Sequence, residues 1–495
     1  MTSTYLTARR RSDDLAALLD GAPVDVLVVG GGVTGAGVAL DAASRGLSVA
    51  LIERNDLAAG TSRWSSKLAH GGIRYIAAGQ IGVAWESAVE RNRLVTRIAP
   101  HLVQPMRFLM PYFPDRPRGS RAATRLLFTV ADGLRAASDT PAWLPRTAWA
   151  DAAAVRSLAP TLLPTNGAHV HVDGALEDDA RLVVALARTA AAHGARVVTH
   201  CRAVELAADG AQVRDELTGD TGEIRARAVV VAAGVWSGGL VDDVPLRPSK
   251  GAHLVVRAEA LGHPRVAVNL LLPGTINRSV FAQPRPDGTV LLGLTDDAVD
   301  AIDDVPAVTD EDERFLLGAV SRRMSRPLTG DDVIGRYAGL RPLLGDEQGS
   351  TSADLSRRHA LLDRGGVLVI VGGKLTTYRR MAQDAVDRVA QRLDHGVGCR
   401  TIDLPLVGAA ARADGRAPRL QRRFGAEADL VAHAGPSEPI AEGVPALRCE
   451  AAWAIDAEGA VTAEDVLDRR LRLDLVPAWR AAAAPYVDEL LSSRG

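Results

Sequence analysis

A glycine-rich turn between an apolar strand and a helix of small residues constrains the fold of this chain most strongly. Positions 30–35 read Gly-Gly-Gly-Val-Thr-Gly, directly after the apolar run 25–29. A helical stretch follows, and then a second apolar run, 48–52, which Glu53 follows directly. Strand, glycine turn, helix and strand within about 30 residues predict a βαβ unit, whose parallel strands lie inside an α/β sheet.

The three glycines of the turn have separate tasks in a dinucleotide site. Gly30 permits the tight turn, Gly32 lets a pyrophosphate approach the backbone, and Gly35 lets helix and strand pack closely. The helix N-terminus offers free N–H donors to the phosphates. The carboxylate of Glu53 suits the ribose hydroxyls and would repel the 2′-phosphate of NADP, although Arg54 follows it. The pattern therefore predicts a dinucleotide site.

The rest of this sheet comes much later in the chain. One apolar strand, 228–232, leads to Gly234, and another, 367–371, leads to Gly372-Gly373-Lys374. Such separation is typical of a flavoprotein with inserted domains. The presence of a single fingerprint disfavours a second, pyridine nucleotide. FAD is therefore the expected cofactor.

The expected fold is α/β: a Rossmann-like FAD-binding domain, an inserted and mainly antiparallel β-sheet substrate domain, and a C-terminal helical domain. The Ala- and Arg-rich stretch 80–165, which prolines interrupt, predicts helices. The expected segments are an N-terminal extension (1–22), a discontinuous FAD-binding domain (about 23–80, 167–240 and 335–395), the substrate domain (about 81–166 and 241–334) and the helical domain (396–495).

Composition excludes several other classes of protein. A net charge of −2 gives no reason to expect nucleic acid as a partner. The three cysteines lie far apart without a CxxC pair, which argues against a disulfide or metal site. No apolar run is long enough to span a bilayer. Of the 58 basic residues only three are lysine, at positions 67, 250 and 374, so each marks a place where an ammonium group is favoured over a guanidinium group.

Several segments together resemble one family. The longest reads Gly-Thr-Ser-Arg-Trp-Ser-Ser-Lys-Leu-Ala-His-Gly-Gly-Ile-Arg-Tyr over 60–75. The others are 178–182, 250–256, 339–343, 372–379 and 461–470. In this order they resemble the FAD-dependent, aerobic-type glycerol-3-phosphate dehydrogenases of the D-amino-acid-oxidase-like superfamily. The resemblance covers about 25–480, includes all three lysines, and departs from the family at Arg63-Trp64 and Leu294.

The resemblance implies oxidation of sn-glycerol 3-phosphate to dihydroxyacetone phosphate, with hydride passing from C2 to flavin N5. Such a site needs cations for the phosphate and a base for the C2 hydroxyl. The implied catalytic residues are His253, Arg341, Lys374 and His70, with the choice of base left open between the two histidines. The implied substrate-binding residues are Arg74, Tyr75, Arg357, Arg341 and Lys374. The implied cofactor-binding residues are Gly30, Gly32, Gly35, Glu53, Arg54, Thr61, Ser62, Ser66, Lys67, Val204, Gly234, Trp236, Gly373, Leu375 and Thr376.

Electrons must leave the reduced flavin, and the sequence offers neither a redox cysteine pair nor a second cofactor motif. Quinone or oxygen is therefore the expected acceptor. Quinone implies a membrane surface, for which the basic and amphipathic stretch 116–134 is the candidate; the alternative is a helix that packs its apolar side on the core. The expected location is the cytoplasm, with peripheral attachment to the inner face of the cell membrane. The oligomeric state stays open, a homodimer being one candidate.

Three alternatives share this fold. The first is a glycerol-3-phosphate oxidase that uses oxygen. The second is a flavin oxidase of amines or amino acids, which needs one arginine for a carboxylate and an apolar pocket instead of a cluster of cations. The third is a flavoprotein without catalytic activity that uses the scaffold for binding.

Overall fold

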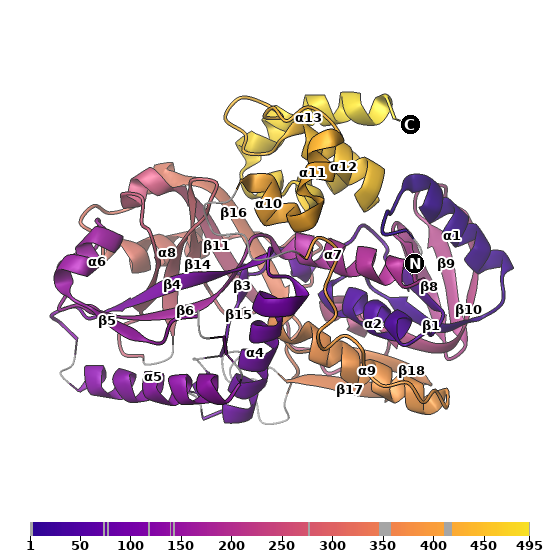
Figure 1. Cartoon of the computed structure of the whole chain (residues 1–495), viewed down its shortest axis with the longest axis horizontal. Helices are drawn as coiled ribbons and strands as arrows, with labels where there is room; N and C mark the ends of the chain where they lie inside the picture. The colour runs from indigo at the N-terminus through magenta and orange to yellow at the C-terminus, as the bar shows by residue number, and fades with distance from the viewer. Residues whose placement is uncertain are drawn as a thin grey trace.

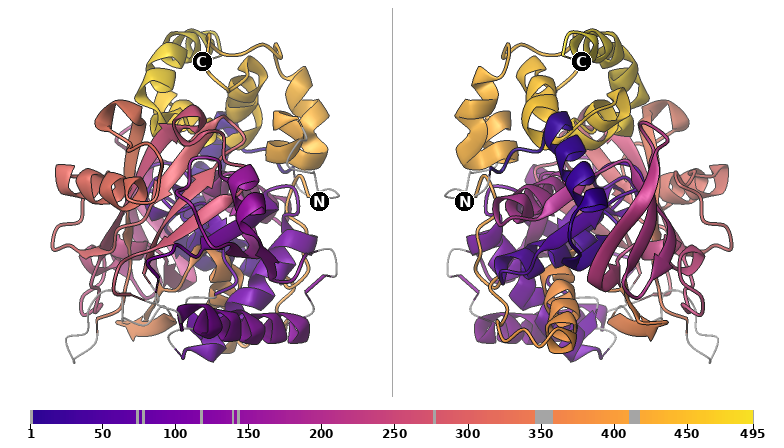
Figure 2. Two further views of the ribbon diagram at one scale, coloured as in Figure 1. Left: turned by 90° about the vertical axis from the view of Figure 1, so that its left-hand side faces the viewer. Right: turned by 90° about the vertical axis from the view of Figure 1, so that its right-hand side faces the viewer.

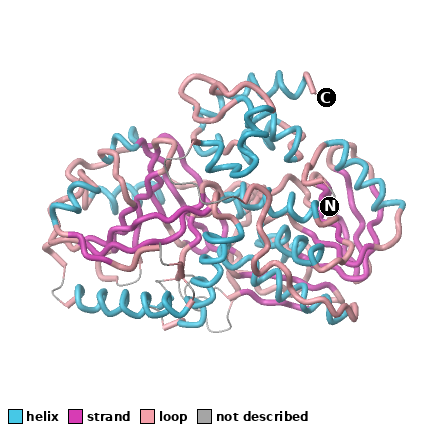
Figure 3. The backbone as a smooth tube through the Cα atoms, in the orientation of Figure 1, coloured by secondary structure: helices cyan, strands magenta, loops and turns pink. Residues whose placement is uncertain are grey.

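Two β-sheets lie side by side in this computed structural model, with a helical domain above them (Figure 1). The structure describes residues 3–72, 75–76, 79–116, 119–138, 140–141, 144–275, 278–345, 358–409 and 418–494. Figure 3 separates the strands of the two sheets from the helices that cover them.

The first sheet contains the expected βαβ unit. Its strand order is β17-β18-β10-β1-β2-β7, and β8 and β9 continue antiparallel from β10. The neighbouring pairs from β18 to β7 are all parallel. The bounds are β1 (Val24–Val29), β2 (Val49–Ile52), β7 (Arg196–Val198), β8 (Cys201–Ala207), β9 (Gly210–Asp215), β10 (Thr221–Val231), β17 (His359–Arg364) and β18 (Val367–Gly372).

Alternation along β1 determines what covers each face of this sheet. Val26 and Val28 pack in one core with α2 (Val33–Ser44), α7 (Asp179–Ala192) and α9 (Tyr378–Arg392). Leu27 and Val29 point to the other face and pack with α1 (Ala8–Asp20), β8 and β9. A central parallel strand is buried on both faces, which explains why residues 25–29 read as an almost continuous apolar run.

The second sheet has the order β15-β11-β14-β13-β12-β4-β6-β3, with β16 on β11 and β5 on β6. It is antiparallel except between β4 and β12. Its strands are β3 (Leu68–Ala69), β4 (Val103–Pro111), β5 (Ala148–Ala150), β6 (Ala168–Leu176), β11 (Ser249–Arg257), β12 (Ala267–Leu271), β13 (Ser279–Pro284), β14 (Thr289–Gly293), β15 (Asp297–Ala298) and β16 (Val333–Arg341). Its helices are α4 (Ile81–Arg93), α5 (Ser120–Ala137), α6 (Ala152–Leu158) and α8 (Asp310–Ser321).

Two features of this sheet differ from the expectation. Residues 103–111 form strand β4 and not helix, and the parallel pairing with β12 involves only Phe108 and Leu109, so that both prolines of β4 lie outside that pairing. In addition, β6 and β16 belong to this sheet, although the expected segments place their residues largely with the FAD-binding domain. Sheet membership follows from long-range pairing, which the sequence pattern does not reveal.

The C-terminal domain is helical, as expected. It contains α10 (Arg419–Phe424), α11 (Ala428–His433), α12 (Arg448–Glu458), the short helix η8 (Asp465–Arg470) and α13 (Pro477–Ser492). The two side views place it on top of both sheets, with α1 beside it (Figure 2). Among the helices that the structure describes, none is long and apolar enough to cross a membrane.

Replacement of Gly35 by alanine tests the close approach of α2 to β1. A Cβ at Gly35 would lie 1.9 Å from the carbonyl oxygen of Gly30, so we expect overpacking to lower the free energy of unfolding by about 1–3 kcal/mol. The control is Gly318→Ala in α8, where a Cβ meets nothing within 4 Å and helix propensity predicts a gain of about 0.5–1 kcal/mol. Thermal unfolding of the cofactor-free variants measures both, and equal effects would contradict the packing argument.

Candidate active site

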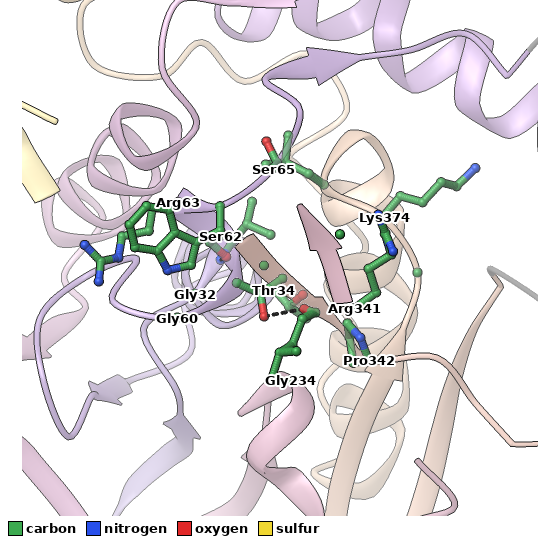
Figure 4. A pocket seen from close by; sticks show the side chains of 18 of the residues that line it. Gly32, Thr34, Gly60, Ser62, Arg63, Ser65, Gly234, Arg341, Pro342 and Lys374 are labelled. Atoms are coloured by element: carbon green, nitrogen blue, oxygen red, sulfur yellow. Dashed lines mark hydrogen bonds between the residues drawn. The ribbon is translucent and has the colours of Figure 1, made fainter. Parts of the chain in front are cut away.

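A cavity of about 960 Å³ lies where the two sheets meet. Its walls include residues that follow the carboxyl ends of β1, β2, β10 and β18, which is the edge where open α/β sheets bind ligands. Figure 4 shows Gly32, Gly60 and Ser62 on one side of this pocket and Arg341 and Lys374 on the other. The volume lies at the upper end of the range of about 300–1,000 Å³ for cofactor sites.

The glycine turn has the geometry that a pyrophosphate needs. A Cβ at Gly30 (φ 116°) would lie 2.7 Å from the carbonyl oxygen of Ala232. At Gly32 a Cβ would meet only the Ser62 hydroxyl, at 3.1 Å, and the rest of a larger side chain would enter the cavity. The Ser62 hydroxyl accepts the N–H of Val33 (2.9 Å) at the start of α2. This helix N-terminus therefore borders the cavity, with the N–H of Val33 already paired to Ser62.

Glu53 is fixed beside that turn. Its Oε2 accepts the N–H of Gly31 (2.6 Å) and its Oε1 accepts the N–H of Asn55 (2.9 Å). Burial raises the pKa of this carboxyl, and the two backbone N–H groups act in the opposite direction. The guanidinium of Arg54 lies over the ring of Trp236, 5.4 Å from its centroid. Both side chains line the same end of the cavity as Glu53.

The opposite end of the cavity is formed by the segment after β18. Gly373 has φ 75°, and a Cβ there would lie 2.3 Å from the sulfur of Met381. The short helix η6 (Leu375–Thr377) follows and continues into α9. The backbone at the start of these helices faces the cavity, where it suits the polar edge of a flavin ring. The glycine cradle, Glu53 and this second helix start together fit FAD.

His253 on β11 is buried at the cavity wall. Its Nε2 lies 3.0 Å from the Ser66 hydroxyl, and its ring stacks on Tyr337 of β16 (centroids 4.5 Å apart, planes 8° apart). The strand register places these two residues opposite each other. Burial lowers the pKa of His253 well below its usual value, and the positive charges of Arg341 and Lys67 lower it further. The lowered pKa favours the neutral imidazole, which can accept a proton, and it also makes the ring a weaker base.

Arg341, at the end of β16, faces the same cavity. Its guanidinium donates to the Ser249 hydroxyl (2.9 Å), to Oδ1 of Asp296 (2.9 Å) and to the carbonyl oxygen of Thr295 (3.0 Å). Ser249 lies directly opposite Arg341 in the β11–β16 register. These partners fix the fork of the guanidinium at the wall.

Lys374 and His70 also line the cavity, whereas Tyr75 lies behind them. The ammonium of Lys374 is 2.5 Å from the Ser87 hydroxyl and 4.1 Å from the centroid of the Tyr75 ring. The Tyr75 ring in turn lies 6.0 Å from that of His70. The Tyr75 ring therefore contacts two lining residues and is not itself among the described residues that line the cavity, so its contact with substrate stays a prediction.

Two residues expected at the cofactor are not among the described residues that line the cavity. The ammonium of Lys67 is buried against Oδ1 of Asp179 (2.7 Å), and burial lowers its pKa. The Val204 side chain is exposed on β8, next to Ala203, which does line the cavity. Lys250 pairs with Asp312 (2.7 Å), so Lys374 is the lysine that reaches the cavity.

The other expected residues divide as follows. Thr61, Ser62, Ser66, Gly234, Trp236, Leu375 and Thr376 line the cavity with the residues already described. Gly35 packs against the turn behind it. Arg74 and Arg357 lie outside the described residues.

The two departures from the family pattern lie close to His253 and also line the cavity. The Trp64 ring stacks on the ring of Tyr337, with the two centroids 5.7 Å apart. Leu294 packs in the same apolar cluster. Arg63 covers the other face of Trp64, 4.1 Å from its centroid. These bulky residues therefore form part of the cavity wall beside the histidine.

Sequence reasoning missed an apolar arm of the cavity. Its walls come from β4, α5, β12 and β13, and they include Phe108, Met110, Leu127, Leu271 and Phe281. His171 lines the same arm, and burial lowers its pKa to about 3. Isolated apolar side chains on strands look like ordinary core residues, so nothing in the sequence distinguished them.

The variant Gly32→Val tests the cradle. Because the space beyond Gly32 is open apart from the Ser62 hydroxyl, we expect the apo-protein to fold while valine blocks the pyrophosphate and flavin content falls at least about tenfold. Flavin absorbance per mole of protein and the melting temperature of the apo-protein measure the two effects. Full flavin content in this variant would contradict the assignment.

Comparison with known proteins agrees with this geometry. Residues 25–379 match the model of the FAD-dependent oxidoreductase family, and residues 370–494 match that of the C-terminal domain of alpha-glycerophosphate oxidase. A solved glycerol-3-phosphate dehydrogenase from Bacillus halodurans, complexed with FAD, has a TM-score of 0.76 at 28% identity and covers 98% of this chain and 94% of its own. The L-alpha-glycerophosphate oxidase of Mycoplasma pneumoniae, at 20% identity and a TM-score of 0.58, shares the fold.

Curated relatives extend the match to the full chain. Glycerol-3-phosphate dehydrogenase 1 of Mycobacterium tuberculosis is 47% identical, over 99% of each chain. The aerobic glycerol-3-phosphate dehydrogenase of Staphylococcus aureus is 34% identical, over 78% of this chain and 71% of that one. The chain therefore belongs to the family of FAD-dependent glycerol-3-phosphate dehydrogenases.

Proposed function

We propose that this chain oxidises sn-glycerol 3-phosphate to dihydroxyacetone phosphate, and that His253, Arg341 and Lys374 act on the substrate. The observation that carries the proposal is the position of these three side chains on one cavity together with the dinucleotide cradle. Bound FAD supplies the hydride acceptor, and the protein has to position the substrate and handle its charge and its proton.

The phosphate of the substrate needs cations because it is close to a dianion at neutral pH. Arg341 presents a fork suited to two phosphate oxygens, and Asp296 and Ser249 hold that fork in place. Lys374 lines the cavity just before η6, and its ammonium group lies beside Ser87 and the Tyr75 ring at the rear of that wall. An amino-acid oxidase would need a single arginine for its carboxylate, so two cations on the wall favour a phosphate.

His253 is the better candidate for the base that takes the C2 hydroxyl proton. It is neutral at pH 7, and its ring is held by the Tyr337 stack and by Ser66. A fixed ring keeps the accepting nitrogen aligned with one donor, which proton transfer requires. His70 lines the cavity as well. Its ring is tilted by 36° to that of Tyr75, whereas His253 and Tyr337 stack with their planes 8° apart, so the His70 ring is held less firmly.

The variant Arg341→Ala tests the phosphate contact. Loss of one charge-assisted partner in a buried site typically costs about 2–5 kcal/mol, so we expect kcat/KM for glycerol 3-phosphate to fall accordingly. Activity with glycerol, which lacks the phosphate, should fall much less. The matched control is Arg336→Ala on the same strand, where the arginine pairs with Glu313 at the surface. Equal losses with both substrates would show that Arg341 is structural.

The variant Lys374→Arg tests whether shape matters as well as charge. The ammonium fits between Ser87 and the Tyr75 ring, and a planar guanidinium is wider. We expect kcat/KM to fall at least about tenfold, or about 1.4 kcal/mol, while FAD stays bound. Lys250→Arg is the control because that lysine pairs with Asp312 instead of lining the cavity. Wild-type kcat/KM in Lys374→Arg would contradict the steric argument.

The electron acceptor is proposed to be a membrane quinone, approached through α5. On the outer face of this helix Leu126 is 67% exposed and Val130 is 39% exposed, and Trp85 of the neighbouring α4 is 38% exposed. Leu127, on the inner side, lines the apolar arm of the cavity. Figure 1 shows α5 along one edge of the molecule, beside α4. An exposed apolar stripe with arginines beside it suits a lipid interface.

Replacement of Leu126 by glutamate tests this surface. The charge should weaken cosedimentation with anionic vesicles at least about tenfold and lower turnover with a lipid-dissolved quinone, because the apolar face is what inserts. Turnover with a water-soluble dye should stay unchanged. Leu217→Glu, at an exposed leucine in the turn after β9, is the control. Equal vesicle binding in both variants, or stoichiometric hydrogen peroxide from wild-type turnover in air, would contradict the quinone proposal.

A further inference from the structure

The segment that carries Glu53 is anchored to the C-terminal domain. Three residues beyond that acid, Asp56 is fully buried. It accepts hydrogen bonds from Nε of Arg469 (3.0 Å) and from both terminal nitrogens of Arg470 (2.6 and 2.8 Å). These arginines end η8, more than 400 positions along the chain. The ribose-facing segment and the C-terminal domain are thus joined by a buried ion cluster.

A second connection runs through Asp465, the first residue of η8. Its carboxylate pairs with Arg469 and lies 3.1 Å from Nε2 of His200. The backbone N–H of His200 donates to the carbonyl oxygen of Asn55, two residues after Glu53. Asp465 is fully buried and lines no part of the cavity itself. Asp465 holds together Arg469 and His200, which both line the cavity.

The ion cluster brings residues of the C-terminal domain to the cavity wall. Thr462, Glu464 and Arg469 of the C-terminal domain line the same cavity as Glu53 and His200. Glu53 marks the ribose of the adenosine half, because the acid after the second strand of a dinucleotide fold accepts the ribose hydroxyls. The C-terminal residues are of mixed charge, which suits a neutral nucleoside and not a phosphate.

We infer that the C-terminal domain forms one wall of the adenosine end of the FAD site, through Thr462, Glu464 and Arg469, and that FAD binding and docking of this domain stabilise each other. A ligand that binds only the docked arrangement must favour docking by the same free energy with which docking favours the ligand. The inference rests on FAD as the cofactor and is independent of the substrate and of the acceptor.

The variant Asp465→Asn tests this inference, with Asp468→Asn as its matched control. Both changes remove one carboxylate charge from η8, but Asp468 pairs with Arg480 of α13 within the C-terminal domain (2.7 Å). Apo-protein is titrated with FAD, and separately with ADP, which carries only the adenosine half. We expect Asp465→Asn to raise both dissociation constants about tenfold or more and Asp468→Asn to leave both unchanged.

Hydrogen exchange on the wild-type protein gives a second measurement that needs no variant. FAD should slow exchange of the amides in 461–470 and leave those in 477–492, in α13, nearly unchanged. Identical exchange with and without FAD would overturn the inference. So would equal FAD affinities of the two variants, or a loss of FAD affinity in Asp465→Asn without a loss of ADP affinity. Failure of the FAD-loaded wild-type protein to oxidise glycerol 3-phosphate would count against the proposed function and would leave this comparison of FAD affinities untouched.

Discussion

The approach of α2 to the end of β1 determines where everything else in this site lies. Gly30 and Gly35 allow the helix to start directly at the strand end, where a Cβ on either residue would clash with the backbone of Ala232 or of Gly30. With α2 in that position, its N-terminus faces the edge to which β10 and β18 bring their own glycines. The cofactor cradle is therefore formed jointly by the segments that follow β1, β10 and β18, and not by one loop.

The second sheet provides the groups proposed for the chemistry through the register of two strands. On β11 and β16, His253 lies opposite Tyr337, and Ser249 lies opposite Arg341. One register therefore fixes both the stacked imidazole and the anchored guanidinium, and a shift by one residue would turn both away from the cavity. Preorganisation of this kind places charge and proton acceptor before the substrate arrives.

The sequence predicted the parts of the site that depend on local chemistry. The glycine turn, Glu53 and the helix start after Gly373 were predictable because each needs particular residues at fixed spacing. Lys67 and Val204 were not, because a lysine in a motif looks the same whether it meets a ligand or a buried carboxylate such as Asp179. Strand β4 was read as part of a helical stretch because its two prolines look like interruptions of a helix. Both prolines lie in the β4–β6 register, which only the three-dimensional arrangement shows.

The most direct test of the account is anaerobic addition of sn-glycerol 3-phosphate to the FAD-loaded protein while the flavin absorbance is followed. The account predicts rapid bleaching of the oxidised band by this substrate and much slower bleaching by glycerol at equal concentration, because the proposed role of Arg341 and Lys374, which line the cavity, is to hold the phosphate. An unchanged spectrum with glycerol 3-phosphate, together with bleaching by an amino acid or an amine, would contradict it.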